Sequence, residues 1–507
     1  MGEILIGRGE MPVVLPARYG TRHGLVAGAT GTGKTVTLML LAEGFSRLGV
    51  PVFLADVKGD VAGLACPGTA SDKLRERLAT IGMSDWKPEA SPVVFWDIYG
   101  ALGHPLRTTV SEVGPTLLSR MLELNDTQAG VLDIAFALAD ADGLLLLDLG
   151  DLRALLAFVA DNRKEVSTRY GLVSGASIGA IQRALLRLEQ GGGAQFFGEP
   201  ALELADFMRR DLSGRGIVNV LSAEQLVLRP RLYSNFLLWL LSELFETLPE
   251  VGDVELPKLV FVFDEAHLLF DDCPPALLQR IEQVVRLIRS KGVGVFFCSQ
   301  NPDDIPGNVL GQLGNRFQHA LRAYTPREQK AVRSAAETFV PNPNIDVAEV
   351  IGQLGIGEAL VSTLQDKAVP MPVQRTLIAP PRCRMGPITE VERNEQRTRS
   401  PVGSRYDTAV DRDSAEEMLQ RKAAATAAPA PAAGTSPAPA PVGKPSAPQA
   451  PAAQADAGWS TRIGEWMWGT KRRRGAVEAM AKSAMRSVGS RLGRQILRGV
   501  LGGISRG

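Results

Sequence analysis

Gly28-Ala29-Thr30-Gly31-Thr32-Gly33-Lys34-Thr35 fits G-x-x-x-x-G-K-[ST], the pattern of a loop whose backbone N–H groups wrap phosphates. The apolar run Leu25–Ala27 enters the loop, and an apolar, helix-favouring run over 36–45 leaves it. Strand, glycine loop and helix N-terminus therefore follow in the order that phosphate binding needs. The glycines permit positive φ and a close approach of backbone to phosphate. The alternative, a glycine-rich turn that matches by chance, does not explain this context.

The polar residues of the loop have distinct expected roles. All eight residues from Gly28 to Thr35 are predicted to contact the nucleotide, with the Lys34 ammonium on the β and γ phosphates. The Thr35 hydroxyl is predicted to be a ligand of Mg²⁺, which prefers oxygen donors and substrate phosphates. The expected ligands of this site are therefore ATP and Mg²⁺, although nothing in the sequence excludes GTP.

A second motif lies about 230 residues later, in Lys258-Leu-Val-Phe-Val-Phe-Asp264-Glu265-Ala266-His267. Five consecutive apolar residues that deliver two carboxylates are typical of a buried parallel strand that ends at an active site. Asp264 is predicted to hold Mg²⁺ through water, and Glu265 to polarise the attacking water as general base.

Two further strands are predicted to end in polar residues at the same edge of the sheet. The run over 50–56 leads to Asp56 and then Asp60, either of which would face Mg²⁺ or an incoming subunit; a cap or turn aspartate is the alternative. The run over 293–299 ends at Gln300, which is placed to sense the γ phosphate. The alternative for Gln300 is an amide that satisfies loop backbone.

The composition is that of an ordinary soluble protein. The chain has 507 residues, 45% hydrophobic and 22% charged, with a net charge of +1 that gives no global field for a polyanion. Its four cysteines are far apart, without a C-x-x-C pair, so we expect reduced thiols rather than disulfides or zinc. No secretory leader or apolar run of membrane-spanning length is evident, and we expect a cytoplasmic protein.

These patterns predict an α/β protein in five parts. Residues 1–60 and 216–385 would form the two parts of the nucleotide-binding core, which closes with a β hairpin over 358–362 and 371–378. Residues 61–215 read as a mainly helical insertion, with one strand-like run over 93–97. Residues 386–457 read as a charged and then Ala/Pro-rich disordered linker, and 458–507 as a basic, Trp-containing amphipathic helix.

The C-terminal segment carries a strong positive charge that is not evident from the net charge of the whole chain. Gly458–Gly507 holds eleven Lys or Arg against two Glu, a local charge of +9, together with Trp459, Trp466 and Trp468. Three readings stay open for this segment. It could bind an anionic membrane surface, a nucleic-acid backbone with bases stacked on tryptophan, or its own core and other copies of the chain.

The order of these motifs resembles the HerA/FtsK branch of phosphate-loop ATPases, and most closely the bacterial HerA-like (DUF853) proteins. The resemblance rests on Gly28–Thr35, the strand ending at Asp56, the helical insertion, Asp264-Glu265-Ala266-His267, Ser299-Gln300 and Asn315-Arg316. It implies a RecA-like core that hydrolyses ATP and assembles with itself, commonly into a hexameric ring with sites between subunits. It also implies an arginine supplied by a neighbour, for which Arg289 and Arg316 are the candidates.

The expected function is therefore that of a Mg²⁺-dependent ATPase, an oligomeric DNA translocase or helicase-like motor. The alternative is an ATP-controlled binding or scaffold protein whose basic tail engages a membrane or a partner, without translocation. Stimulation of hydrolysis by DNA discriminates between the two.

Overall fold

A mostly parallel sheet organises the computed structural model, which describes residues 2–271, 275–322 and 325–427. The strands of this sheet lie in the order β2-β1-β14-β11-β10-β3-β9-β8-β4-β7-β5-β6. Their bounds are β1 Glu3–Arg8, β2 Pro12–Pro16, β3 Gly24–Ala27, β4 Val52–Asp56, β5 Val93–Asp97, β6 His104–Pro105, β7 Val218–Ser222, β8 Leu259–Phe263, β9 Val293–Ser299, β10 Asn315–His319, β11 Glu358–Ser362 and β14 Gln374–Ile378. The short strands β12 (Leu364–Gln365) and β13 (Val369–Pro370) form a separate pair.

The centre of the sheet has the strand order of a RecA-like core. β3 enters the glycine loop between β10 and β9, and β8 and β4 follow beyond β9, all in parallel pairings. Val26 in β3 lies opposite Phe317 in β10 and Cys298 in β9. The predicted closing hairpin is confirmed, because β11 and β14 pair antiparallel and continue the sheet beyond β10. The α/β fold class predicted from the sequence is therefore correct.

Both faces of the central strands are buried, which explains their unbroken apolar runs. In β4, Phe53 and Ala55 face one hydrophobic cluster, whereas Val52 and Leu54 face another. Successive side chains alternate between the two faces of a strand, so such a strand must be apolar at every position. The helix that follows the glycine loop covers the second face, with Leu38 and Leu41 in the same cluster as Val52.

The helices fall into two groups, those of the core and those of the insertion. Those of the core are α1 Lys34–Arg47, α2 Asp72–Ile81, α10 Pro230–Thr247, α11 His267–Phe270, α12 Pro275–Leu287, α13 Gly307–Leu310, α14 Pro326–Glu337 and α15 Val347–Gln353. Those of the insertion are α3 Val110–Met121, α4 Asp126–Asp142, α5 Leu149–Asp161, α6 Arg163–Tyr170, α7 Gly175–Leu188, α8 Ala194–Phe196 and α9 Leu204–Phe207. Only Asn162 separates α5 from α6.

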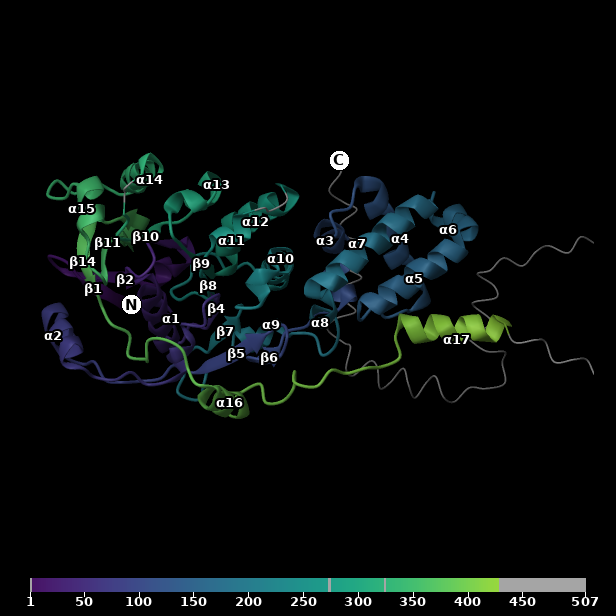
Figure 1. The fold of residues 1–507 in the computed structure, drawn as a ribbon, viewed down its shortest axis with the longest axis horizontal. Helices are drawn as coiled ribbons and strands as arrows, with labels where there is room; N and C mark the ends of the chain where they lie inside the picture. Colours follow the sequence, from purple (N-terminus) through teal and green to yellow (C-terminus); the bar gives the residue numbers. More distant parts are fainter. Residues whose placement is uncertain (1, 272–274, 323–324, 428–507) are drawn as a thin grey trace, which may run out of the picture. The chain divides into compact units, whose positions relative to one another are not determined.

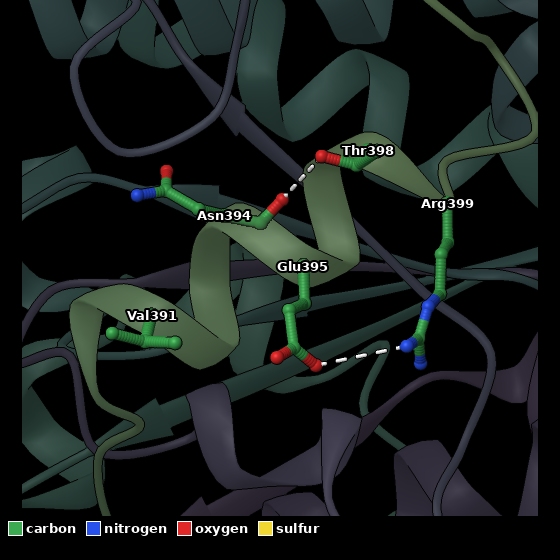
Figure 2. A pocket seen from close by; sticks show the side chains of 5 residues that line it. All are labelled: Val391, Asn394, Glu395, Thr398 and Arg399. Atoms are coloured by element: carbon green, nitrogen blue, oxygen red, sulfur yellow. Dashed lines mark hydrogen bonds and ion pairs between the residues drawn. The ribbon is translucent and has the colours of Figure 1, made fainter.

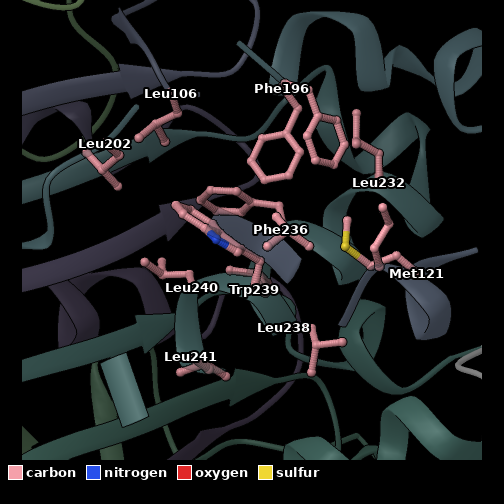
Figure 3. Close-up of a cluster of buried hydrophobic side chains, with 14 of the residues drawn as sticks. Leu106, Met121, Phe196, Leu202, Leu232, Phe236, Leu238, Trp239, Leu240 and Leu241 are labelled. Atoms are coloured by element: carbon pink, nitrogen blue, oxygen red, sulfur yellow. The ribbon is translucent and has the colours of Figure 1, made fainter. Parts of the chain in front are cut away.

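The insertion shares a hydrophobic core with the sheet. Phe196 in α8 packs edge-on against Trp239 and Phe236 in α10, with ring centroids 5.5 and 5.8 Å apart. Figure 3 shows these rings among leucines from both parts of the chain. Because buried aromatic pairs contribute to a common core, the insertion is part of the folding unit rather than a separate lid.

The predicted boundary of the insertion at residue 61 is wrong. β5 and β6 belong to the main sheet, where β5 pairs with β7, and α2 packs near β1. The first segment that leaves the sheet begins with α3 at Val110. The β run that forms β5 could not be assigned to the core from the sequence, because its partner in the sheet, β7, lies about 120 residues further along the chain.

The predicted disordered linker is also wrong for residues 386–427. This segment forms α16 (Glu390–Thr398) and α17 (Ala415–Ala427), and Figure 1 shows α17 beside α5, in agreement with their contacts. Arg397 and His104 both contact Asp407, at 2.7 and 2.8 Å. Ion pairs and hydrogen bonds thus hold a segment that has few apolar residues. The Ala/Pro-rich stretch from 428 and the basic segment 458–507 lie outside the described residues.

Three of the four cysteines can be checked against the expectation of reduced thiols. Cys66, Cys298 and Cys383 are buried and free. Cys273 falls in the gap at 272–274. Across the described ranges, no helix combines the length and apolarity required to cross a bilayer.

His23 provides a test of the fold by acidification. It is fully buried ahead of β3, where its Nδ1 accepts a hydrogen bond from Val295 N at 3.0 Å. Burial, with the charges of Arg289 and Arg22, lowers the pKa of His23 from 6.5 to about 4. The unfolded chain therefore binds more protons between those values, and the folded state loses stability as the pH falls from 6.5 towards 4.

We expect His23→Asn to remove this acid sensitivity. Asparagine offers an acceptor oxygen in place of Nδ1 and tolerates the positive φ of 60° at this position. Between pH 7 and pH 5 the wild type should lose about 2 kcal/mol more unfolding free energy than the variant, by linkage. Urea unfolding at the two pH values measures this difference. Equal losses in both proteins would show that His23 is not buried as a neutral group.

Candidate active site

The glycine loop between β3 and α1 is anchored to the strands on both sides. Gly28 N donates to Ser299 O at 3.3 Å at the end of β9, and Ala29 N donates to Ala320 O at 2.8 Å after β10. Gly28 and Gly33 have φ of 151° and 112°, in the region that favours glycine. A Cβ on Gly28 would lie 2.5 Å from His319 Cβ, so the loop could not take this form with a side chain there.

Lys34 is withdrawn into the loop. Its side chain is buried, and its Nζ donates to Gly28 O at 2.6 Å and to Ala29 O at 3.2 Å. These carbonyls hold the ammonium at the mouth of the glycine loop. The loop thus presents a buried cation and a series of backbone N–H groups at a helix N-terminus, which together form an anion site.

Thr35 and Asp264 are the candidate oxygen donors for a metal ion. Thr35 Oγ1 donates to Asp60 Oδ2 at 3.1 Å. Asp264 follows β8, is 3% exposed, and its Oδ2 has no hydrogen-bond partner among the described residues. Burial raises the pKa of Asp264, and the neighbouring charge of Glu265 raises it further. Within the described ranges, no three His, Cys, Asp or Glu side chains form a metal site alone. The set fits Mg²⁺, which completes its shell with phosphate oxygens and water.

Glu265 is held by a lysine that the sequence patterns did not single out. Lys58 Nζ forms an ion pair with Glu265 Oε1, and His267 Nδ1 lies 3.3 Å from Glu265 Oε2. Burial alone would raise the pKa of Glu265, but the hydrogen bond and charge of Lys58 lower it. Glu265 also has a φ of 45°, which is uncommon outside glycine and is found at functional sites. The carboxylate is thus ionised and fixed in position.

The Lys58–Glu265 pair should be measurable as a coupling energy. We expect Lys58→Met to lower the unfolding free energy by roughly 1–2 kcal/mol, because it leaves the buried Glu265 carboxylate without its partner. In a Glu265→Gln background the same change should cost less than half as much. Chemical denaturation of the four proteins gives the cycle, and Lys73→Met on the exposed side of α2 is the control. Identical losses in both backgrounds would mean that the pair is absent in solution.

Asp56 makes the hydrogen bonds of a cap or turn aspartate, one of the two alternatives predicted for it. Its Oδ1 accepts hydrogen bonds from Gly59 N at 2.8 Å and Lys58 N at 3.2 Å, and its Oδ2 from Val61 N at 3.3 Å. Asp56 therefore caps the turn that presents Lys58 and Asp60 to the site. Burial, with the charges of Asp60 and Asp264, raises the pKa of Asp56 to about 7.

The remaining predicted residues lie at two edges of the sheet. Gln300 is exposed directly after Ser299, whose carbonyl contacts the loop, and so lies next to the phosphate site. Arg289 and Arg316 lie at the amino ends of β9 and β10, the opposite edge from the loop. Arg289 pairs with Asp253 at 2.9 Å and is partly exposed. Arg316 is largely buried, which lowers its pKa, and donates to Leu310 O at 3.4 Å.

His319 is a second residue that the patterns missed. It lies under the loop, where its Nε2 and Thr37 Oγ1 are 2.9 Å apart, and burial with the charge of Lys34 lowers its pKa to about 4. Because the His319 imidazole is neutral, it adds no second positive charge beside the buried Lys34 ammonium. The sequence feature that could have indicated a role for His319 is its position at the end of a short β run.

A hollow on the surface of α16 is separate from this site. Figure 2 shows its lining, Val391, Asn394, Glu395, Thr398 and Arg399, all from one helix and its end. No residue of the glycine loop lines it.

Nearly the whole chain matches a protein-family model. The family model described as "Helicase HerA-like C-terminal" matches residues 3–507. Two curated relatives are named DNA double-strand break repair helicase HerA. That of Sulfurisphaera tokodaii is 30% identical over 109 residues, and that of Saccharolobus solfataricus 27% over 104. These matches span 21% and 20% of the relatives' lengths, and 21% and 20% of this chain.

Solved structures that are similar to this chain include the conjugative coupling protein TrwB and a VirB4 protein. The conjugative coupling protein TrwB has a TM-score of 0.49 at 15% identity, with 75% of this chain and 91% of that chain covered. VirB4 of Thermoanaerobacter pseudethanolicus has a TM-score of 0.46 at 16% identity, with 77% and 97% covered. TrwB has also been solved in complex with ADP and Mg²⁺, and that structure has a TM-score of 0.46 at 16% identity, with 76% and 92% covered.

Proposed function

The chain belongs to the HerA-like helicase C-terminal family, and from this membership and the site geometry we propose that it is a Mg²⁺-dependent ATPase that works as an oligomeric DNA motor. One observation carries the proposal. The glycine loop with its buried Lys34, and the Asp264–Glu265 pair after β8, meet at the carboxyl edge of a parallel sheet, where ligands of such sheets bind.

Each residue of the site has a task in phosphoryl transfer. The loop N–H groups and Lys34 bind the phosphates, so that Lys34 exchanges the carbonyls of Gly28 and Ala29 for phosphate oxygens. Glu265, ionised and fixed by Lys58, orients a water and accepts its proton. Gln300 beside the loop contacts the γ phosphate.

Mg²⁺ would be held by Thr35 and, through water, by Asp264, and would neutralise charge on the phosphates. The fit rests on the buried Asp264 Oδ2, which lacks a partner among the described residues. Asp60, already bonded to Thr35, completes the acidic surroundings of this position.

A subunit-supplied arginine best fits Arg289. Charge on the γ phosphoryl oxygens is met by a rigid planar cation from a neighbour. Arg289 is partly exposed at the edge remote from its own loop, so it can reach a second copy, whereas Arg316 is largely buried. This supports a ring in which each site lies between two subunits.

The alternative, a nucleotide-controlled scaffold, is favoured by one contact. Arg393 in α16 donates to Ser222 Oγ, at the end of β7, at 3.2 Å. Arg393 is partly buried, and Asp56, near the site, is one of its charged neighbours. The segment that leads to the basic tail therefore contacts the edge of the sheet where nucleotide binds. In this reading ATP sets the exposure of the tail to nucleic acid, a membrane surface or the core.

Hydrolysis with and without DNA tests these readings. Phosphate release by the purified chain should require Mg²⁺ and rise several-fold with double- or single-stranded DNA if the protein is a motor. Mg²⁺-dependent turnover that no nucleic acid changes would favour the scaffold. Absence of Mg²⁺-dependent turnover under all these conditions would contradict the ATPase itself.

A further inference from the structure

A glycine-bounded turn, Gly355-Ile356-Gly357, lies directly against the phosphate loop. Gly357 N donates to Thr32 O at 3.0 Å. A Cβ built on Gly33 would lie 3.3 Å from both Cα and N of Gly357. The turn before β11 and the loop after β3 are therefore in van der Waals contact, although about 320 residues separate them in the sequence.

Charged side chains fix this turn from two sides. Arg77 in α2 donates through Nη2 to Gly357 O at 2.5 Å and through Nε to Ile378 O at 3.0 Å. Glu358 Oε2 accepts from Gly355 N at 2.7 Å and pairs with Arg375 at 2.7 Å. Gly357 has a φ of 78°. The turn is thus pinned at both glycines, and only its central residue is free of these bonds.

That central residue is an isoleucine in contact with solvent. Ile356 is 81% exposed. An exposed aliphatic side chain alone needs no explanation. Here, however, a turn held by hydrogen bonds from Arg77 and to Glu358 presents Ile356 beside a phosphate loop, so Ile356 offers an ordered apolar surface at the edge of a binding site.

The direction of the nucleotide places its nucleoside on this side. The sheet order is β11-β10-β3-β9-β8, so the Asp264–Glu265 pair after β8 and the turn before β11 lie on opposite sides of the loop. The γ phosphate must point towards Glu265 for hydrolysis. The α phosphate and the nucleoside then extend towards β10 and β11, where Ile356 lies.

We propose that Ile356 forms the nucleoside subsite, packing against the base and ribose of the bound nucleotide, with Arg77 and Glu358 as positioning residues. The inference rests on the proposed function, because it requires a nucleotide in the loop. An aliphatic side chain contacts the face of any purine, so Ile356 contributes affinity without selecting adenine over guanine.

Paired ligands with and without a nucleoside test the subsite. Binding of Mg²⁺·ATPγS and of Mg²⁺·tripolyphosphate is measured by calorimetry for the wild type and Ile356→Ala. We expect the variant to bind ATPγS about three- to tenfold more weakly, the loss of an apolar contact, and to bind tripolyphosphate within a factor of two of the wild type. Leu172→Ala, at an 87% exposed leucine in the insertion, is the matched control and should change neither.

Arg77→Ala should reproduce the selective loss, since it frees the turn without touching the nucleotide. In turnover assays both variants should raise KM for ATP and for GTP alike, with kcat nearly unchanged. Ile356→Ala that weakens both ligands equally, or neither, would overturn the subsite and leave the ATPase intact. A wild type that binds neither ligand would overturn the ATPase and the subsite together.

Discussion

Lys34→Ala is expected to reduce Mg²⁺-dependent ATP turnover by at least about 100-fold, the scale seen when one preorganised charge donor is lost. The Lys34 ammonium is the buried cation of the glycine loop, held by the carbonyls of Gly28 and Ala29. Thr32 Oγ1 also donates to Ala29 O, at 2.7 Å, but this hydroxyl carries no charge. Initial rates of phosphate release over a range of ATP concentrations measure the loss.

The matched control is Lys422→Ala. Lys422 lies in α17, which packs against α5 of the insertion, and it pairs with Asp142 at 3.2 Å. Its removal should leave turnover within about twofold of the wild type, as expected for a substitution that touches no residue of the site. Turnover that persists in Lys34→Ala, with the control unchanged, would place the hydrolytic site elsewhere.

Glu265→Gln is expected to lower kcat by about 10²- to 10⁴-fold, the contribution of a general base. Glutamine keeps the shape of the side chain and an oxygen for Lys58, but it cannot accept the proton of the attacking water. Binding of Mg²⁺·ATPγS should change only a few-fold, because Glu265 acts on water rather than on the bound phosphates. Single-turnover hydrolysis and equilibrium binding separate the two effects.

Glu43→Gln tests whether the loss is specific to this carboxylate. Glu43 is 6% exposed and accepts hydrogen bonds from Arg382 N and Cys383 N, so it matches Glu265 in burial. We expect its variant to hydrolyse ATP at close to the wild-type rate. If Glu265→Gln and Glu43→Gln lose kcat to the same degree, Glu265 is structural and the base lies elsewhere.

Local sequence patterns predicted the parts of the site that depend on one segment. The order of strand, glycine loop and helix fixed Lys34 and Thr35, and a buried apolar run placed Asp264 and Glu265 at a strand end. Lys58 was missed because its role arises from a pair with Glu265, 207 residues away. Asp56 and Asp60 were left as alternatives because only the turn geometry shows that Asp56 caps it while Asp60 reaches Thr35.

The predicted domain boundaries were wrong where the segment is stabilised by contacts other than those of periodic apolar residues. The segment after residue 386 has few large apolar residues, yet Arg412 binds Glu199 at 2.6 and 2.7 Å, and Tyr406 is fully buried. Such contacts join residues that are about 200 positions apart. The composition of this segment indicates only the entropic cost of ordering it. It does not show the distant ion-pair and hydrogen-bond partners that offset this cost.

A structure of the chain with Mg²⁺, ADP and beryllium fluoride bound shows whether the glycine loop and the residues after β8 form one site. We expect Lys34 Nζ to leave Gly28 O for the γ-phosphate mimic, with Mg²⁺ on Thr35 and Glu265 facing that mimic. Nucleotide bound away from the loop, or Lys34 still held by Gly28 with the ligand present, would contradict this expectation.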